Sequence, residues 1–436
     1  MQDRVEREWL FALLAVLVLA GSIIEEIIVI IVPLSLIVII VNFIPKRGVF
    51  FRFVGKERGS RKIVEFSMGL ILLTLLVTFA GMPMNIFVVS AILVGGVYII
   101  EKVMLVRDIS PIREVAGFVI GAWFLGAFSQ VLSMINGIQI GTSRVVFFAV
   151  IGGLLVALVR EDWIGKNRTA SMLAIALVLW ILSLPAFEYL DIIPQQLMFG
   201  IGIAGGLGYI SWRVGSASIT GMLTGIIFSL IVIVFGGFTW FSIMLVFFGV
   251  GSLVARLNYK EKLEMGVAEE NEGAREAKNV LANAVIAVIC VVGFSMNTQL
   301  GISGNIFIFG FAGAIAAAMS DTLSSEIGIL FENTRLITTF SKVEVGTDGG
   351  VTVQGSLAGF VGAFFIGLVT SWTLGVGLGG AIVIGIAGVT GMIGDSVLGA
   401  SLEDKWMSNE GVNFMATLIG AIASIGGAIL VGIVLL

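Results

Sequence analysis

Long uninterrupted apolar runs recur along the whole of this 436-residue chain. Each run has about 17–23 residues, which is enough for a helix to cross the hydrocarbon core of a bilayer. The runs are continuous rather than alternating, which argues against a β-barrel. Open sheets are excluded in lipid because their edges leave backbone groups without hydrogen-bond partners. The sequence therefore predicts an all-α polytopic membrane protein.

The composition supports this fold class and excludes several kinds of site. The chain is 58% hydrophobic and 12% charged, with a mean hydropathy of +1.09, too little polar surface to cover a soluble domain. It has no histidine, which excludes imidazole metal ligands and imidazole general bases. Cys290 is the single cysteine and lies within an apolar run, so it is interpreted as a buried structural thiol.

We expect about 15 transmembrane helices from the apolar runs. The expected spans are 9–23, 27–44, 63–80, 84–105, 115–135, 144–159, 169–187, 195–212, 219–235, 239–255, 280–297, 304–320, 355–371, 376–394 and 413–433. The first span has no convincing cleavage site behind it and is interpreted as a retained helix rather than a signal peptide.

The positions of the basic residues predict the orientation of these spans. With the N-terminus in the cytoplasm, the inner segments hold all 25 Lys and Arg residues except Arg144. The outer loops are short and nearly free of positive charge, as the positive-inside rule requires. We therefore expect a multi-pass protein of the cell membrane with a cytoplasmic N-terminus.

The character of the chain changes near residue 200, which predicts two domains. Residues 1–200 form an N-terminal transmembrane bundle with few polar residues in its spans, and its role is not assigned. Residues 201–436 have longer cytoplasmic segments and more glycine. We expect the functional site in this second domain, facing the cytoplasm.

The stretch "AAMSDTLSSEIG" places two carboxylates at the end of an apolar run. On a continuous helix Asp321, Ser324 and Ser325 share a face, whereas Glu326 lies about 140° from Asp321. Either the helix breaks here or the two acids serve different partners. One interpretation is an interfacial helix start capped by Asp321 or Thr322. The other is a hard-cation site, because carboxylate and hydroxyl oxygens suit Mg²⁺.

A faint internal repeat points to a second acid. Two small-residue runs begin at Ala312-Gly313 and at Ala387-Gly388, and they end respectively in Ser320-Asp321-Thr322 and Gly394-Asp395-Ser396. Small residues allow helices to approach closely, so the two aspartates could share one site. The alternative is that such helices recur in any tightly packed bundle. The following "SLEDK", which contains Glu403, is interpreted as an ordinary solvated loop.

The segment "SKVEVGTDGGVTVQG" combines strand and turn signals. "VEV" and "VTV" alternate around "GTDGG", which predicts a small cytoplasmic β-hairpin near 343–353. The turn is either a plain one or a phosphate cradle, since glycines expose backbone N–H groups in a concave nest. Its candidate residues are Gly346, Thr347, Gly349 and Gly350. It is no Walker A loop, because no Gly-Lys-Ser/Thr follows.

Four further polar residues are candidates with two open interpretations each. Arg335 and Lys342 either neutralise phosphate charge or anchor the inner side of the membrane. Asn279 and Asn283 share a helix face and bind either substrate or a neighbouring helix. The basic and aromatic loop "RGVFFRFVGKER" fits the anionic inner leaflet, and no nucleic-acid partner is expected.

The motifs of the second domain resemble one integral membrane family. "NVLANA", "SDTLSSEIG", "RLITTFSKVEVGTDGGVTVQGSLAGFVGA" and "GDSVLGASLEDK" have its order and spacing over roughly residues 205–436. The family is a domain of unknown function that includes plant phytyl-phosphate kinase and animal transmembrane protein 19. More remotely, the chain is similar to membrane cytidylyltransferases and polyprenol kinases.

The resemblance implies phosphoryl or nucleotidyl transfer between a nucleoside triphosphate and an isoprenoid alcohol or phosphate. It places the family's acidic motifs on Asp321, Glu326 and Asp395, and its glycine-rich motif on the "GTDGG" turn. Cytidylyltransferases carry a histidine in the comparable segment. This chain has Thr347 there and no histidine, which disfavours cytidylyl transfer.

We therefore expect a membrane-embedded isoprenyl-phosphate kinase that uses Mg²⁺ and either ATP or CTP at the cytoplasmic interface. Its expected catalytic residues are Asp321, Asp395 and Arg335, and its metal ligands are Asp321, Glu326 and Asp395. The expected substrate- or nucleotide-binding residues are Asn279, Asn283, Ser324, Ser325, Lys342, Gly346, Thr347, Gly349, Gly350 and Ser396. The alternative is a multi-pass transporter or lipid flippase, because glycine-rich helices and intramembrane acids also serve transport.

Overall fold

The computed structural model describes residues 57–104, 111–135, 141–160, 167–188, 191–264, 274–403 and 406–434. The spans expected at 9–23 and 27–44 lie outside these residues. Every expected span from 63–80 onward coincides with a helix. In the part of the chain described, nine helices are long and apolar enough to cross a membrane. The all-α polytopic class is confirmed, whereas the full span count and the orientation stay predictions.

The chain divides into two compact units, Met1–Ile192 and Ile193–Leu436. The boundary expected between residues 200 and 201 falls inside helix α9 (Pro194–Arg213), which belongs to the second unit. The helix begins within one residue of the expected span 195–212, and Pro194 fits its first turn because the missing N–H costs no helical hydrogen bond there. The roles assigned to the two domains stay predictions.

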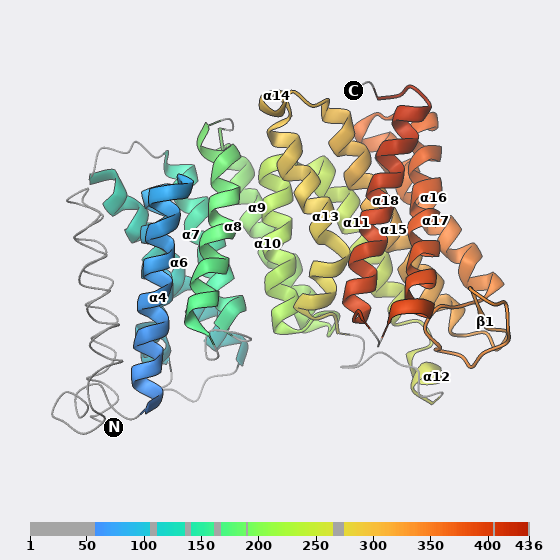
Figure 1. Ribbon diagram of the computed structural model, residues 1–436, viewed down its shortest axis with the longest axis horizontal. Coiled ribbons are helices and arrows are strands. Elements are labelled where there is room, and N and C mark those ends of the chain that lie inside the picture. Colours follow the sequence, from blue (N-terminus) through green and yellow to red (C-terminus); the bar gives the residue numbers. More distant parts are fainter. Residues whose placement is uncertain are drawn as a thin grey trace. The chain divides into compact units, whose positions relative to one another are not determined.

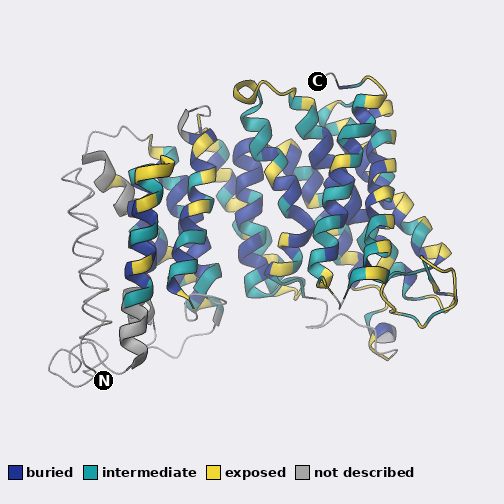
Figure 2. Cartoon of the chain, viewed as in Figure 1, coloured by how far each residue is buried: buried dark blue, intermediate teal, exposed yellow. Residues whose placement is uncertain are grey.

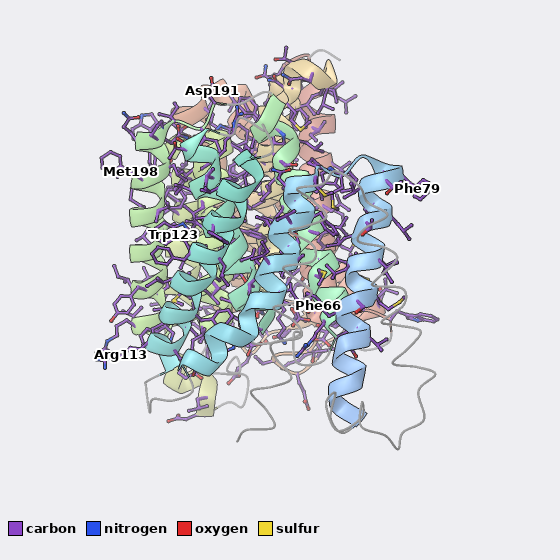
Figure 3. The ribbon with its side chains drawn as sticks, turned by 90° about the vertical axis from the view of Figure 1, so that its left-hand side faces the viewer. Phe66, Phe79, Arg113, Trp123, Asp191 and Met198 are labelled. Atoms are coloured by element: carbon purple, nitrogen blue, oxygen red, sulfur yellow. The ribbon has the colours of Figure 1, made fainter. Side chains whose placement is uncertain are left out.

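The first unit packs through an apolar interior. Its described helices are α4 (Glu57–Ala80), α5 (Met84–Met104), α6 (Pro111–Ile135), α7 (Thr142–Val159) and α8 (Arg168–Glu188). Phe66 of α4 is fully buried, whereas Phe79 on the same helix is 81% exposed and projects outward (Figure 3). Large exposed apolar side chains on spanning helices are the surface that lipid covers.

The second unit is a bundle built around one central helix. Its elements before the central helix are α9, α10 (Ile219–Gly236), α11 (Phe238–Ala255), α12 (Tyr259–Glu264), α13 (Ala277–Ser295) and α14 (Asn297–Leu300). They are followed by α15 (Gly304–Gly328), α16 (Val353–Leu374), α17 (Gly377–Leu402) and α18 (Asn409–Leu430) (Figure 1). Helix α15 contacts α11, α13, α16, α17 and α18. Its buried face is continuous, and exposed residues gather in the loop that follows it (Figure 2).

Glycines set the spacing between the central helices. A Cβ placed on Gly313 of α15 would lie 2.4 Å from the carbonyl oxygen of Gly420 in α18. A Cβ on Gly391 of α17 would lie 2.4 Å from the Cβ of Ala317 in α15. No larger side chain fits at either contact, so the small-residue runs bring three helix backbones together.

A two-stranded antiparallel sheet lies in the loop between α15 and α16. Strand β1 (Arg335–Leu336) pairs with β2 (Gly350–Val351), with Arg335 opposite Val351. A small antiparallel sheet was expected here, but its first strand is not the "VEV" segment. The "VTV" segment is not a strand along its whole length either: Val351 belongs to β2, whereas Val353 is the first residue of α16. The reason is a helix cap: the Thr352 hydroxyl accepts a hydrogen bond from the Gly355 N–H at 3.1 Å.

Substituting Gly313 by valine should destabilise the bundle. The new Cβ would meet both the Gly420 carbonyl and Ser424, and overpacking of this kind typically costs about 1–3 kcal/mol. The matched control is Gly426→Val on α18, where a Cβ meets nothing within 4 Å. Thermal unfolding of the purified protein in detergent measures both. Equal midpoints for the two variants would show that close helix contact at Gly313 is unimportant.

Candidate functional site

Asp321 and Asp395 come together in the second unit. Helix α15 runs unbroken past Asp321 to Gly328, so Asp321 does not cap the start of a helix. Asp395 lies in α17, and the two carboxyl groups are within hydrogen-bonding range of each other. The Oδ1 atom of Asp395 is buried and has no hydrogen-bond partner among the described residues. The two helices that contain the small-residue runs thus place Asp321 and Asp395 next to each other.

Contacts of Ser320 restrict the positions of the helices that carry the two aspartates. Its hydroxyl donates a hydrogen bond of 2.9 Å to the Gly359 carbonyl of α16 and lies 3.2 Å from the Met392 sulfur of α17. Ser320 is fully buried. Three helices are therefore joined one residue before Asp321, and the carboxylate is held at the edge of a tightly packed core.

A cavity of about 270 Å³ opens beside the two aspartates. It is lined by Asp321, Ser324, Ser325, Gly328, Ile329, Thr334, Gly346, Thr347, Asp348, Gly349, Gly350, Thr352, Asp395, Ser396, Glu403 and Asn409. Most of the predicted site residues are in this set, including both aspartates, the three hydroxyl residues beside them and the whole glycine motif. No Lys or Arg is among these lining residues.

The glycine loop is seated directly on α17. Gly346 and Gly349 have φ angles of 84° and 71°, a left-handed conformation that favours glycine. A Cβ on Gly349 would lie 2.4 Å from the Cβ of Ala400 and 2.5 Å from the carbonyl oxygen of Ser396. The loop backbone therefore approaches α17 as closely as glycine allows, and it forms one wall of the cavity.

Two helix N-termini also reach the cavity. Thr352 caps α16, and Asn409 is the first residue of α18, whose N-cap is Ser408. Both Thr352 and Asn409 line the cavity. The unpaired N–H groups and the partial positive charge at a helix N-terminus attract anions. The cavity thus combines carboxylates with anion-binding backbone groups.

Glu326 has a different partner from Asp321. It forms a buried ion pair with Lys262 of α12, with exposed side-chain fractions of 10% and 3%. Glu326 does not line the cavity, which corrects its expected place beside the aspartates. The cause is the continuous helix, which turns Glu326 away from the face of Asp321. Among the described residues, no group of three or more His, Cys, Asp or Glu side chains forms a ready metal site.

Arg335 and Lys342 lie in the loop but not at the cavity wall. The Arg335 guanidinium is exposed and donates a hydrogen bond of 2.8 Å to the Phe340 carbonyl, closing a turn of its own loop. Lys342 is exposed and forms an isolated β-bridge with Arg335. Neither residue lines the cavity, and the phosphate contacts expected of them stay a prediction.

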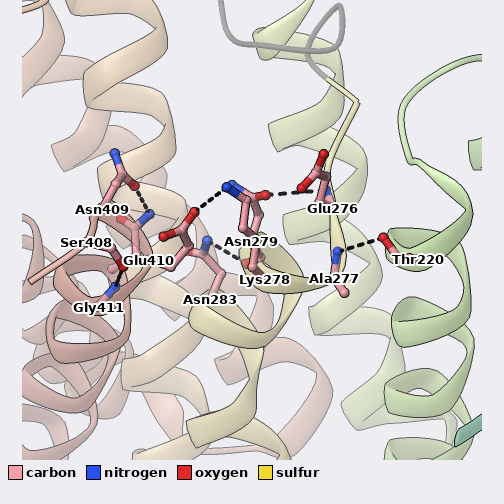
Figure 4. Close-up of polar contacts among 11 residues, drawn as sticks. Thr220, Glu276, Ala277, Lys278, Asn279, Asn283, Ser408, Asn409, Glu410 and Gly411 are labelled. Carbon is pink, nitrogen blue, oxygen red and sulfur yellow. Dashed lines mark hydrogen bonds and ion pairs between the residues drawn. The ribbon is translucent and has the colours of Figure 1, made fainter. Parts of the chain in front are cut away.

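Asn279 and Asn283 serve the start of α13 instead of the cavity. Asn279 and Glu276 form a capping box, and the Asn283 amide donates to the Asn279 carbonyl at 3.0 Å (Figure 4). Lys278 pairs with Glu410 of α18 at 2.8 Å beside them. The hydrogen bonds of Asn279 and Asn283 are local to the start of α13, whereas the contact with α18 is made by Lys278.

Several site residues were missed from the sequence. Glu403 was interpreted as a solvated loop residue, yet it lines the cavity together with Asp348 and Thr334. Arg275 is half-buried, and its positive charge acts on Asp321. No spacing rule relates Arg275 to Asp321, because Arg275 lies just before α13 and reaches α15 only through the tertiary packing of α13 against α15.

Comparison with known proteins identifies the family. The model of the family described as integral membrane protein DUF92 matches residues 202–421, half of the chain, and this segment contains the whole cavity. The chain belongs to this family. No solved structure matches it.

Relatives in the DUF92 family come from archaea, bacteria and plants. An uncharacterized membrane protein of Methanocaldococcus jannaschii is 40% identical over 215 residues, covering 47% of this chain and 83% of that protein. An uncharacterized membrane protein of Synechocystis is 35% identical over 206 residues, which cover 45% of this chain and 77% of that protein. Protein VTE6, chloroplastic, of Arabidopsis thaliana is 31% identical over 204 residues, which cover 44% of this chain and 61% of that protein.

Replacing Gly349 by alanine should displace the glycine loop from α17. The variant has both a strained φ and a Cβ that overlaps Ala400 and Ser396. Gly301→Ala is the matched control, because its φ is also positive but its Cβ meets nothing. We expect faster proteolytic cleavage between residues 336 and 350 for Gly349→Ala only. Equal cleavage of this segment in both variants would show that contact between Gly349 and α17 does not hold the loop in place.

Proposed function

We propose that this protein is a membrane-embedded, nucleotide-dependent isoprenyl-phosphate kinase that converts a lipid monophosphate to the diphosphate. The observation that carries the proposal is the pair formed by Asp321 and Asp395 at a cavity walled by a glycine loop and two helix N-termini. The family resemblance supports it, since that family includes plant phytyl-phosphate kinase. The Arabidopsis relative, 31% identical over 204 residues, adds a plant protein similar to this chain.

The charge of the cavity supports a requirement for a divalent cation. Among the residues that the structure describes, four carboxylates line it, those of Asp321, Asp348, Asp395 and Glu403, and no basic side chain does. Triphosphate oxygens would be repelled from these carboxylates in the absence of a cation. Mg²⁺ typically binds one or two protein carboxylates together with substrate phosphates. Asp321 and Asp395 fit that role, because Asp395 Oδ1 is buried and has no partner among the described residues.

The remaining groups fit the positioning that phosphoryl transfer requires. The N–H groups of the glycine loop and of the first turns of α16 and α18 can bind phosphate oxygens. The hydroxyl of Ser324 can donate a further hydrogen bond. Mg²⁺ would neutralise charge on the transferred group, and the protein groups would hold donor and acceptor in line.

The proposed reaction also suits a chain without histidine. An oxygen of the lipid monophosphate attacks the terminal phosphorus of the nucleoside triphosphate. The bond from this phosphorus to the bridging oxygen breaks, the nucleoside diphosphate leaves, and the lipid diphosphate is formed. The second pKa of a phosphate monoester is about 6, so the attacking oxygen is already ionised at neutral pH. No general base is needed, whereas a lipid alcohol would require one.

The alternative of a transporter or lipid flippase is less well supported. Transporters place their substrate sites near the bilayer midplane between broken helices. Here α15 and α17 are unbroken helices, and the cavity is completed by the loop before α16 and by Asn409 at one end of the bundle. Such a site suits a soluble nucleotide that meets a lipid headgroup at the membrane surface.

The direct test is phosphate transfer by the purified protein. With labelled ATP or CTP, Mg²⁺ and geranylgeranyl or phytyl phosphate, the label should appear in the lipid diphosphate. Asp321→Asn and Asp395→Asn should each lower the rate by about 100-fold or more, since losing one group that stabilises developing charge has effects of this size. Glu332→Gln, an exposed loop residue outside the cavity lining, is the control. No transfer across a panel of lipid phosphates, together with nucleotide-independent lipid flux in vesicles, would favour the flippase.

Metal removal gives a second test of the same site. Treatment with EDTA should abolish transfer, and added Mg²⁺ should restore it, because the acidic cavity repels uncompensated triphosphate. Binding of Mn²⁺ in the presence of nucleotide, followed by electron paramagnetic resonance, should disappear in the Asp321→Asn/Asp395→Asn double variant. Full transfer in the metal-free protein would contradict the assigned role of the two aspartates.

A further inference from the structure

An apolar groove of about 250 Å³ lies between α9, α10 and α11 in the second unit. Its wall runs from Ala204 to Ser211 on α9, from Gly221 to Ser229 on α10 and from Phe241 to Ser252 on α11. Most of the lining side chains are apolar or glycine, and Arg275 is the charged residue among them. The groove therefore has an apolar body and one cationic position.

Glycines create the space in this groove. A Cβ built on Gly225 or on Gly249 would meet nothing within 4 Å, although both residues line the wall. The wall along α11 covers eleven residue steps, about 16 Å at the helical rise of 1.5 Å per residue. That length is about half of the hydrocarbon core of a bilayer, about 30 Å thick. A hydrocarbon chain can therefore lie along the groove.

Arg275 is held firmly at one end of the groove. Its backbone N–H donates to the Ser216 carbonyl at 3.0 Å, and its carbonyl accepts from the Ser218 N–H at 3.1 Å. Gly221 is required beside it, because a Cβ there would overlap the Arg275 carbonyl oxygen. The backbone of Arg275 is thus fixed against the start of α10.

The Arg275 side chain connects the groove to the aspartate pair. A Cβ on Gly251 of α11 would lie 2.9 Å from the Arg275 Nη2 and 3.5 Å from the Thr322 methyl of α15. The guanidinium carbon lies 5.6 Å from the centre of the Phe247 ring, and its charge acts on Asp321. Arg275 therefore lies between the apolar groove and the acidic cavity.

We propose that the groove between α9, α10 and α11 binds the hydrocarbon chain of a lipid monophosphate, with the phosphate at Arg275 and directed toward Asp321. Burial of the chain against apolar side chains stabilises binding, and guanidinium forms paired hydrogen bonds with phosphate oxygens. The cation at the end of an apolar groove selects an anionic lipid over the free alcohol. The inference rests on the proposed function for the fate of the phosphate, but the binding step needs neither nucleotide nor metal.

The test uses photo-cross-linking without nucleotide or Mg²⁺. The probe is geranylgeranyl monophosphate with a diazirine at the far end of its chain, added to the full-length protein in nanodiscs. We expect labelled peptides from α9, α10 and α11. Gly225→Leu and Gly249→Leu should each reduce labelling about tenfold or more by filling the groove. Gly206→Leu on α9 is the matched control, because its Cβ also meets nothing and it does not line the groove.

Competition separates the contribution of the headgroup from that of the chain. Unlabelled geranylgeranyl monophosphate should compete at least about tenfold better than geranylgeraniol in the native protein, because only the phosphate pairs with guanidinium. Arg275→Gln should remove this difference while the alcohol competes as before, and Arg275→Lys should restore part of it. Inorganic phosphate alone should not compete.

Three results would overturn the inference: labelling outside α9–α11, labelling unchanged by both leucine variants, or competition by inorganic phosphate equal to that by the lipid phosphate. Because the assay has no phosphate donor, failure of the proposed kinase reaction would leave the labelling pattern intact. Failure of this lipid site would instead remove labelling while Asp321 and Asp395 could still be tested by nucleotide-dependent metal binding.

Discussion

Close contact between the backbones of α15, α17 and α18 is the constraint on which the second unit depends. It exists because glycine and alanine stand wherever these helices cross, as at Gly313, Gly391 and Gly420. Lipid offers little hydrophobic drive for helix association, so van der Waals contact between small residues has to hold the bundle. The same contact places Asp321 and Asp395 side by side, where larger residues would hold them apart.

Two adjacent carboxylates in a packed bundle are unfavourable unless a ligand or proton compensates their charge. Ser320 and the glycine loop add contacts that keep this arrangement in place, through Gly359, Met392 and Ala400. The loop and the two helix N-termini then supply backbone N–H groups suited to anions in the same cavity. The electrostatics of the cavity thus match a cation with phosphate groups, the requirement of phosphoryl transfer.

The second unit separates an acidic cavity from an apolar groove, with Arg275 between them. This separation corresponds to the two parts of an amphipathic lipid phosphate. The surrounding bundle is needed for both parts, because α11 contributes to the groove and also contacts α15. The part of the chain matched by the family contains all of these elements.

The sequence by itself determined the membrane-spanning class, the approximate helix positions, and the Asp and glycine motifs that line the cavity. The length of an apolar run is set by bilayer thickness, so each spanning helix can be predicted from its own stretch of sequence. Only the tertiary structure decided that Glu326 pairs with Lys262, that Arg335 faces its own loop, and that Arg275 and Glu403 belong near the site. Those outcomes depend on helix rotation and on contacts between distant segments. Local residue patterns do not specify these contacts, because the partner of a side chain depends on which distant helix packs against its face.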